Sequence, residues 1–374
     1  MIGITGEYAL TINIGEKSDI VLPQDLVSFK LIEEVGNVVP LIEIIIRVYS
    51  EDLIRYLNSN NLCSIGIGKT TDFTIYGKYI ILNRERIETA TNSILIKLTG
   101  IYDCVKYINA GVIYGNHESS FNIIKELVSN YFTFESDLSN SNDKMNWWSF
   151  NKPVNKFVTD LWLHSNHANE LPLLGITSSG TFRYLSLVNR LKSGNPDWVF
   201  TTNLEERQSN NNFVVLDSVP TIQSNLATNS ALLGFPRSRI VHNIAKIKSK
   251  VSTAGKIKLL NSGQESQLNN IGSVLSKISF INENVHEKYY DMYDYNTKAL
   301  LSLNNYNAKC VFHHDFRDIK ILDTVILKDN NFINSINSDF AGIWLVKKVS
   351  RTIIDHKLYT IVILSKDGIN DLTT

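Results

Sequence analysis

The sequence predicts a mainly β fold with α+β insertions, made of two similar antiparallel β-barrels, a small mixed α/β domain and a helical or irregular domain. Short runs rich in Ile, Val, Tyr and Thr dominate both ends of the chain, and Asn, Gly and Asp separate them. Apolar residues at helical spacing are concentrated between these ends. A chain of 374 residues also exceeds what one hydrophobic core usually supports, so several domains are expected.

The composition excludes several classes of protein. The formal net charge is zero, so no overall field attracts the chain to nucleic acid or to an anionic membrane. Cys63, Cys104 and Cys310 fit neither a disulfide framework nor a zinc knuckle, and we expect reduced thiols. The N-terminus lacks the basic and apolar regions of a signal peptide, and Glu43 and Arg47 interrupt the longest apolar stretch. We therefore expect neither a signal peptide nor a membrane-spanning segment.

Residues 1–108 are predicted to form the first, tube-like β-barrel. The strand candidates are "YALTINI", "PLIEIIIRVYS", "CSIGIG", "FTIYGKYIILNRERI" and "SILIKLTGIYD". One interruption, "SEDLIRYLNSN", places Leu53, Ile54 and Leu57 on one helical face. This spacing predicts a short helix across one end of the barrel.

Residues 109–200 are predicted to form the mixed α/β domain. The segment "SSFNIIKELVSNYF" has an apolar stripe at helical spacing, with the Ser at 119 or 120 as N-cap. A second helix is predicted in "NKPVNKFVTDLWLHSNH", with Asn151 as N-cap and Pro153 in the first turn. The strands of "LPLLGITSSGTFRYLSL" follow, with a tight hairpin turn at Ser179 and Gly180.

Residues 201–235 and 305–374 are predicted to form the second β-barrel, with residues 236–304 as an inserted helical or irregular domain. The strand candidates are "NNFVVLDSV", "AKCVFHHDF", "KILDTVILK" and a C-terminal hairpin. Within the insertion, "RSRIVHNIAKIKSKVSTAGKIKLL" fits neither the helical nor the strand template. The segment "NENVHEKYYDMYDYNTKALLSLNN" has helical spacing and predicts a helix.

The same hairpin pattern occurs near both ends of the chain. Each copy has a Gly, an aromatic residue two positions on and an Arg at the ninth position: Gly77, Tyr79 and Arg86, then Gly342, Trp344 and Arg351. Two interpretations stay open. Either unrelated amphipathic hairpins look alike because strands use few residue types, or the chain contains two related barrels.

The last strand of the second copy is apolar on both faces. One face carries Tyr359, Ile361 and Ile363, and the other carries Leu358, Val362 and Leu364. One face fills the barrel, so the other is expected to contact another domain, subunit or protein.

No residue cluster indicates catalysis or a cofactor. His313 and His314, in "FHHDF" with Asp315, point to opposite faces of a strand and cannot easily share a metal ion. His164 and His167 have a more suitable spacing, but a third ligand is missing and interaction with the helix dipole is the favoured interpretation. "GIGKT" lacks the first Gly of a phosphate loop, and neither "SSG" nor "NSG" has the spacing of a nucleophile elbow. We therefore expect no catalytic, cofactor-binding or metal-binding residue.

Packing is the expected role of the aromatic pair, and exposure to solvent is expected for the carboxylate pairs. Trp147 and Trp148 could stack on sugars or bases, but an anchor into a neighbouring domain is the favoured interpretation. The carboxylate pairs are expected to be solvated: Glu33 with Glu34, and Glu205 with Glu206.

A basic stretch lies between Asp217 and Glu265, where no acidic residue occurs. Its members are Arg237, Arg239, Lys246, Lys248, Lys250, Lys256 and Lys258. The near absence of aromatic residues argues against binding of single-stranded nucleic acid. The stretch is either a solvated face, which is the favoured interpretation, or an interface with an acidic neighbour.

Three stretches resemble the central baseplate hub protein of contractile phage tails, which is related to the hub part of the type VI secretion spike. The first, residues 145–187, resembles the family's helix ending in a Trp-Leu-His-Ser type sequence, followed by an apolar strand and a hairpin. The second, "RDIKILDTVILK", resembles a Gly-Asp-x-Val element in which Asp323 and Val325 match but Leu322 replaces Gly. The third is the hairpin 342–368, which ends in "KDG". The resemblance covers most of the chain in order and length.

The resemblance implies a structural adaptor in the tail baseplate of a virion, synthesised in the bacterial host cytoplasm. It implies a homotrimer whose two barrels per chain form a pseudo-sixfold ring, joining the hexameric tail tube protein to the trimeric central spike protein. Neighbouring baseplate proteins are further partners, and genomic DNA passes through the channel that the ring lines. A β-rich tail or receptor-binding component that binds carbohydrate, and a cell-wall hydrolase, are the alternatives.

Overall fold

The computed structural model describes most of the chain. The described residues are 2–5, 8–15, 24–69, 72–90, 92–167, 170–192, 195–202, 212–225, 238–243, 248–253, 277–280, 285–286, 288–313, 318–328, 342–354 and 357–366. No helix within these ranges has the length and apolar character that crossing a membrane requires. The predicted mainly β fold with α+β insertions is confirmed.

The N-terminal sheet contains the five strands predicted for the first part of the chain and two that were not predicted, β1 and β3. Its elements are β1 (Ile2–Thr5), β2 (Tyr8–Ile14), β3 (Leu26–Glu34), β4 (Leu41–Val48), α1 (Glu51–Ser59), β5 (Leu62–Lys69), β6 (Asp72–Ala90) and β7 (Ser93–Tyr102). Alternate residues of β4 are buried, as its period of two apolar positions predicts. The Ser50 hydroxyl accepts a hydrogen bond from the Asp52 N–H and caps α1.

The mixed α/β part follows directly. Its elements are α2 (Val105–Asn109), β8 (Gly115–Glu118), α3 (Ser120–Val128), β9 (Thr133–Ser136), β10 (Met145–Trp148), α4 (Val154–His164), β11 (Pro172–Ile176), β12 (Thr181–Ser186) and α5 (Leu187–Lys192). The two predicted helices are α3 and α4, and Ser119 caps α3. The predicted turn lies between β11 and β12, where Gly180 has a φ of 79°.

The predicted N-terminus of α4 is wrong. Pro153 is the N-cap, without a side-chain hydrogen bond, and the helix begins at Val154. Asn151 instead has a φ of 59° and follows Phe150 with a φ of 49°. The backbone therefore turns through the left-handed region, which Asn tolerates, before the helix starts.

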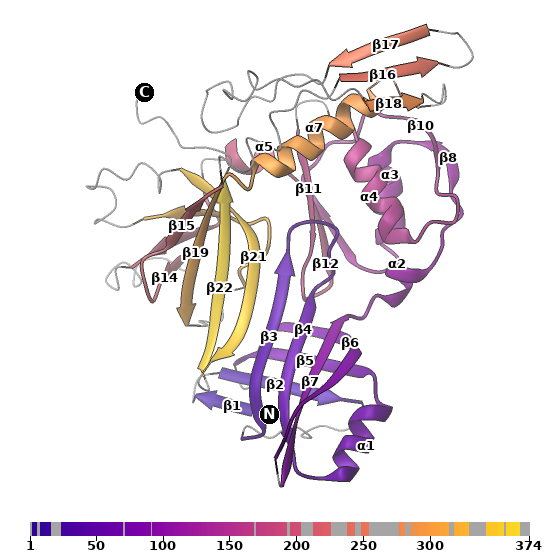
Figure 1. The fold of residues 1–374 in the computed structure, drawn as a ribbon. Helices are drawn as coiled ribbons and strands as arrows, with labels where there is room; N and C mark the ends of the chain where they lie inside the picture. Colours follow the sequence, from indigo (N-terminus) through magenta and orange to yellow (C-terminus); the bar gives the residue numbers. More distant parts are fainter. Residues whose placement is uncertain are drawn as a thin grey trace.

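The remaining elements build the C-terminal sheet and the insertion. They are β13 (Trp198–Thr201), β14 (Phe213–Val215), β15 (Thr221–Ser224), β16 (Ser238–Asn243), β17 (Lys248–Thr253), β18 (Lys277–Phe280), α7 (Tyr289–Ser302), β19 (Tyr306–His313), β20 (Thr324–Leu327), β21 (Ile343–Ile354) and β22 (Lys357–Lys366). The ambiguous basic segment forms strands β16 and β17, which pair with each other, and β16 also pairs with β18. The predicted helix is α7, and it packs on α4 (Figure 1).

The same strand order occurs twice in the chain. In the N-terminal sheet, neighbouring strands follow the order β5-β6-β7-β4-β3. In the C-terminal sheet they follow the order β20-β21-β22-β19-β15. All of these pairs are antiparallel. The strands also correspond in chain order: β3, β4, β5, β6 and β7 of the first copy match β15, β19, β20, β21 and β22 of the second. The insertion with β16, β17, β18 and α7 lies where the first copy has only the short link from β3 to β4.

The repeated hairpins agree in two details, the burial of the aromatic residue and the position of a bulge. Tyr79 and Trp344 are both completely buried. Each hairpin has a β-bulge at the fifth position after its Gly, at Leu82 in β6 and at Lys347 in β21. The ninth positions differ, because Arg86 is exposed whereas Arg351 is buried.

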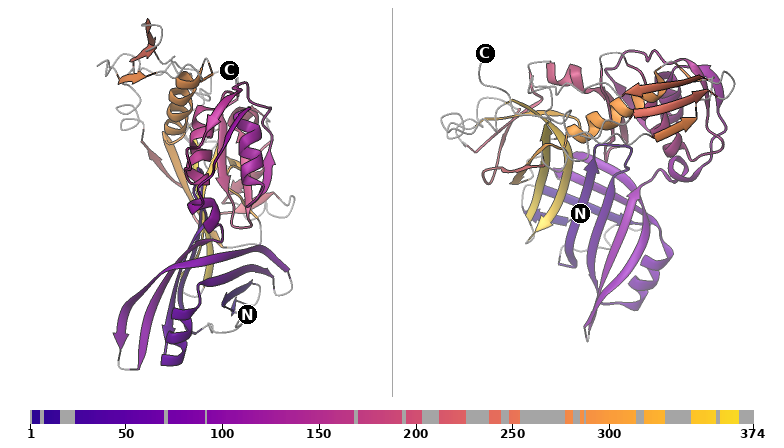
Figure 2. Two further views of the ribbon diagram at one scale, coloured as in Figure 1. Left: turned by 90° about the vertical axis from the view of Figure 1, so that its right-hand side faces the viewer. Right: turned by 45° about the horizontal axis from the view of Figure 1, so that its top comes forward.

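The two sheets lie side by side; helices α3, α4, α5 and α7 lie toward one end of the molecule, and α1 lies at the other end (Figures 1 and 2). Strand β3 joins the sheets by pairing with β4 on one edge and with β21 on the other. On β22, Leu358, Val362 and Leu364 face the core. On its outer face, Tyr359 and its apolar neighbours at positions 361 and 363 are only partly covered.

Candidate functional site

The candidate site is the junction where the two sheets meet the mixed α/β part. Strand β3 reaches all three, because its end continues past its pairing with β21. The N–H of Val35 donates to the carbonyl O of Lys347 at 2.9 Å, and the N–H of Gly36 donates to that of Leu174 at 2.7 Å. One strand end therefore fixes the position of β11 relative to β21.

A buried ion pair occupies the centre of this junction. Glu33 Oε2 accepts a hydrogen bond from Arg351 Nη1 at 2.8 Å, and Oε1 accepts one from the N–H of Ser178. Arg351 Nη2 also donates to the carbonyl O of Ile319 at 3.0 Å. The side chains of Arg351 and Glu33 are 1% and 2% exposed. Each charged group is thus paired and hydrogen-bonded, as burial of a charge requires.

The prediction that Glu33 is solvated is wrong. Glu33 follows Phe29 and Leu31 on the buried face of β3, and the register between β3 and β21 brings Arg351 to it. Glu34 points to the other face and pairs with Lys348 at 3.0 Å. The available signal was a carboxylate at a position that alternation along the strand assigns to the buried face. Arg351 gives the same signal, because it lies between the buried residues Val349 and Ile353 on one face of β21. Glu205 and Glu206 lie outside the described residues.

The hairpin loop between β11 and β12 enters the N-terminal sheet beside this ion pair. A Cβ atom on Gly77 would lie 2.5 Å from the carbonyl O of Ser178, so the close approach requires glycine. Tyr79 lies beneath the same contact, and burial, followed by the Glu33 carboxylate, raises the pKa of its phenol. The first hairpin copy thus uses its Gly and its aromatic residue to receive the mixed α/β part.

A second buried carboxylate, Asp323, connects the mixed α/β part to the C-terminal sheet. It accepts hydrogen bonds from Arg183 Nη1 at 2.7 Å and from Trp198 Nε1 at 2.9 Å. Burial raises the pKa of the Asp323 carboxyl, and the Arg183 guanidinium opposes that effect. Leu322, which stands in place of the family's Gly, has a φ of 71° and is 1% exposed. The Gly-Asp-x-Val element is therefore a tight turn that presents Asp323 to Arg183.

The histidines singled out in the sequence take part in packing and capping. The Nδ1 of His164 lies 2.7 Å from the carbonyl O of Asp160, and its ring stacks on Tyr289 at 3.9 Å between centroids. His167 is buried, with Nδ1 at 3.0 Å from the Ser139 carbonyl O. His313 is exposed at the end of β19, whereas His314 and Asp315 lie outside the described residues. No group of three metal-ligating side chains occurs within the described part of the chain.

The tryptophan pair is divided between core and surface. Trp147 is buried, donates through Nε1 to the carbonyl O of Glu118, and lies beside the ring of Tyr289 in α7. Trp148 is 55% exposed on the opposite face of β10. The two rings cannot form one stacking platform, and Trp147 anchors the helix α7. The side chains of the basic stretch from Arg237 to Lys258 lie outside those that the structure describes.

Comparison with known proteins places this architecture among phage tail and secretion components. No protein-family model and no curated protein sequence matches the chain. A tail protein from Neisseria meningitidis is similar in structure, with a TM-score of 0.58 and 11% identity over 97% of this chain and 98% of that one. The 43 kDa tail protein of prophage MuSo2 from Shewanella oneidensis also has a TM-score of 0.58, with 9% identity over 96% and 98% of the two chains.

A third similar structure comes from a secretion system. It is an Escherichia coli component of the type VI secretion system, itself described as similar to the T4 bacteriophage tail proteins gp27 and gp5. The TM-score is 0.52, with 7% identity over 97% of this chain and 80% of that one. At these identities the similarity concerns the fold. This chain has the fold of phage tail proteins and of type VI secretion spike-related proteins, as the sequence resemblance implied.

Proposed function

We propose that this chain is a structural hub of a phage tail, in which three copies close into a ring between the tail tube and the central spike. The neighbours with this fold are named as tail and secretion components, which supports a structural role in a virion. The proposal includes no catalytic role. The observation that carries it is the strand order shared by the two sheets, because a trimer presents six similar surfaces only if each chain supplies two.

The contact between β3 and β21 is a template for the contact between chains. Inside the chain, β3 of the first copy pairs with the part of β21 that extends beyond its pairing with β20 in the second copy. The counterpart of β3 is β15, and the counterpart of β21 is β6. Within the described residues, β15 pairs only with β19, and no strand pairs with the outer edge of β6 beyond Ile80. The described part of each chain therefore has one open edge of each kind.

The shared registers specify which residues should meet. Arg86 of β6 corresponds to Arg351 of β21 by its place in the hairpin. Leu31 of β3 pairs with Ile42 of β4, and Ile222 of β15 pairs with Ala308 of β19. Ile42 and Ala308 occupy equivalent places in their sheets, so Leu31 corresponds to Ile222. Since Leu31 lies opposite Arg351, Ile222 of one chain is expected opposite Arg86 of the next. Such a head-to-tail contact leaves no open edge once the ring closes.

The domain division belongs to this proposal. We assign residues 1–108 and residues 201–235 with 305–374 to the two ring-forming units, and residues 109–200 to an arm attached to both. The insertion, residues 236–304, joins that arm through α7, whose Asn296 amide donates to the carbonyl O atoms of Leu163 and Ser165 at 3.1 Å each. These bonds satisfy carbonyl groups at the C-terminal end of α4.

A disulfide trap tests the ring directly. Residues that lie opposite each other on paired strands are close enough for a disulfide. The variant Arg86→Cys/Ile222→Cys is expected to form oxidised dimers and trimers when assembled with its tube and spike partners. The three native cysteines are buried and should remain reduced. Arg86→Cys/Ile113→Cys is the matched control, because Ile113 is 90% exposed but lies in the mixed α/β part.

Two outcomes would overturn the proposal. Equal cross-linking in both double variants would show that collisions, and not a defined contact, join the chains. Electron microscopy of assembled particles without threefold symmetry at the position of this chain would exclude the ring itself.

A further inference from the structure

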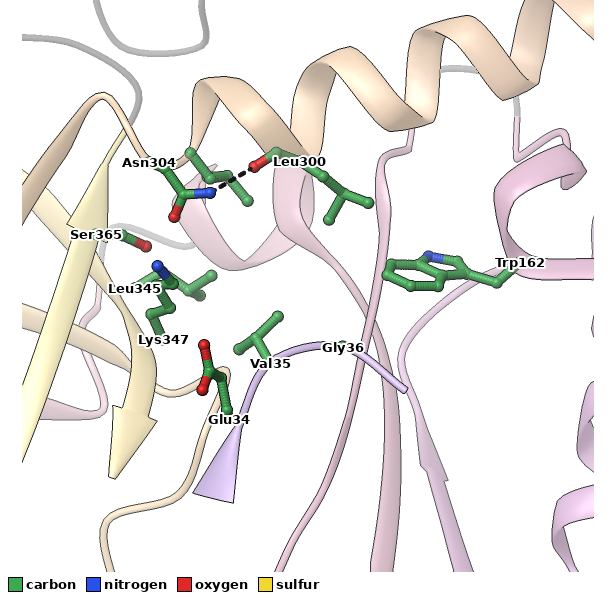
Figure 3. A pocket seen from close by; sticks show the side chains of 10 residues that line it. Glu34, Val35, Gly36, Trp162, Leu300, Asn304, Leu345, Lys347 and Ser365 are labelled. Atoms are coloured by element: carbon green, nitrogen blue, oxygen red, sulfur yellow. Dashed lines mark hydrogen bonds between the residues drawn. The ribbon is translucent and has the colours of Figure 1, made fainter. Parts of the chain in front are cut away.

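A pocket of about 290 Å³ lies on the side of the junction that faces α7. Its walls come from four places that are distant in sequence: the end of β3, helix α4, the C-terminal end of α7 with the residues after it, and strands β21 and β22 (Figure 3). Its size is at the lower limit for small-molecule sites. It can hold a small ligand or one large side chain of another protein.

Lys347 supplies the positive charge in this pocket. It is the bulged residue of β21, and a bulge turns a side chain away from the regular alternation of the strand. Figure 3 shows its amine pointing toward Ser365 and Asn304 and away from the Glu34 carboxylate. That carboxylate is held at 3.0 Å by the Lys348 amine. Among the described residues, the Lys347 amine has neither a hydrogen-bond partner nor an ion-pair partner.

The surroundings of this amine favour an anion. Lys347 is half-buried, and burial lowers the pKa of its amine, an effect that the Glu34 carboxylate opposes. The Glu34 carboxylate is already paired with the Lys348 ammonium, so it leaves the Lys347 ammonium without a paired carboxylate in the pocket. A second carboxylate would restore the solvation that the Lys347 ammonium lost on burial.

The rest of the pocket is suited to an aliphatic group. Leu300 and Leu303 come from α7 and the residue following it, Leu345 comes from β21, and Val35 lies at the end of β3. The Trp162 indole N–H is already used, because it donates to the carbonyl O of Pro172 at 2.8 Å. The Ser365 hydroxyl lies next to the Lys347 amine (Figure 3), and the Asn304 amide is already used, because it donates to the carbonyl O of Leu300 at 3.3 Å.

We propose that this pocket binds a carboxylate on a short aliphatic stem, with the carboxylate on Lys347 and the stem against the leucines. This inference does not depend on the hub function. The carboxylate could belong to a free small acid or to an acidic side chain of a neighbouring protein, and the recognition chemistry is the same.

Calorimetric titration with 4-methylpentanoate tests the site on the full chain. Binding is expected with a Kd of about 1 mM, typical of a ligand of this size, and the neutral 4-methylpentanamide should bind at least tenfold more weakly. Lys347→Met keeps an unbranched side chain of similar shape without the charge and should weaken binding of the acid at least tenfold. Glu34→Gln removes the competing carboxylate and should strengthen it. Lys309→Met removes an exposed lysine of β19 and should have no effect.

The two sources of the carboxylate are distinguished by carbodiimide coupling, followed by peptide mass spectrometry. In the purified protein, added 4-methylpentanoate should acylate Lys347 in preference to Lys309. In assembled particles without added acid, a cross-link from Lys347 to an Asp or Glu of a neighbour assigns the ligand to a protein side chain. If assembled particles give no such cross-link but Lys347 still couples to the added acid, the ligand is a free acid. The proposal is overturned if the amide binds as tightly as the acid, or if Lys347→Met binds like the unmodified protein.

Discussion

Arg351→Met is expected to destabilise the protein by about 3–5 kcal/mol, the usual cost of removing one partner of a buried ion pair. The substitution keeps much of the side-chain volume but removes the charge that pairs with the Glu33 carboxylate, which is 2% exposed. Of the two hydrogen bonds described for that carboxylate, the one from the Ser178 N–H remains. It also removes the donor to the carbonyl O of Ile319, which is buried. Both losses act in the same direction.

A matched control separates burial from charge. Lys97→Met breaks the ion pair with Glu43 in the N-terminal sheet, where the side chains are 32% and 35% exposed. Solvent screens such a pair, so we expect a loss below about 1 kcal/mol. The double variant Glu33→Gln/Arg351→Met no longer buries an unpaired charge, and it should be more stable than Arg351→Met alone.

Urea unfolding followed by tryptophan fluorescence measures these differences, and hydrogen exchange of the β3 and β21 amides shows whether the loss is local to the junction. The reasoning is refuted if Arg351→Met costs less than about 1 kcal/mol, or if the double variant is as unstable as the single one. Either result would mean that water reaches the Glu33 carboxylate at little cost.

Three further predictions concern stability. Gly77→Ala should lower the urea midpoint, because its Cβ would lie 2.5 Å from the Ser178 carbonyl O; an unchanged midpoint would contradict the close approach. Leu322→Gly relieves a backbone cost of about 1 kcal/mol at a positive φ but removes a buried side chain. We expect the free energy of unfolding in urea to fall by about 1–2 kcal/mol, and a rise would contradict this. Burial lowers the pKa of His167 and of His286, so the unfolded state binds more protons below about pH 6.5 and Tm should fall between pH 7 and pH 5. The variant His167→Gln/His286→Gln should flatten this dependence, and a slope like that of the unmodified protein would contradict the assignment.

Local periodicity was enough to predict most of the elements. The apolar stripe of the segment from Ser119 and that of α7 predicted helices, and runs of β-branched and aromatic residues between turn residues predicted β4, β19 and β22. The start of α4 was not predictable, because two consecutive left-handed residues, Phe150 and Asn151, have no signature in apolar spacing. The strand order was also beyond local patterns, since β22 pairs with β19 across the intervening β20 and β21.

The junction was predictable only in part. The family resemblance indicated Asp323, and the hairpin repeat indicated Tyr79 and Trp344, all of which are buried at or near it. Glu33 was misassigned because charged residues are usually exposed to solvent, no strand was predicted over residues 26–34, and the partner of Glu33 lies 318 residues away. Only the register of β3 against β21 brings the two together, and a register between distant strands is a property of the folded chain.

The difference between the two hairpin copies bears on how a ring would assemble. Arg351 is buried because β3 covers it and supplies Glu33. By the same correspondence, the residue of β15 in the place of Glu33 is Ser224, which offers Arg86 of the next chain no carboxylate. The contact within the chain is therefore reinforced by a buried ion pair, whereas the proposed contact between chains depends on strand pairing and apolar burial alone. A hub built in this way would hold its own two sheets rigidly and remain a separable monomer until a trimeric partner brings three copies together.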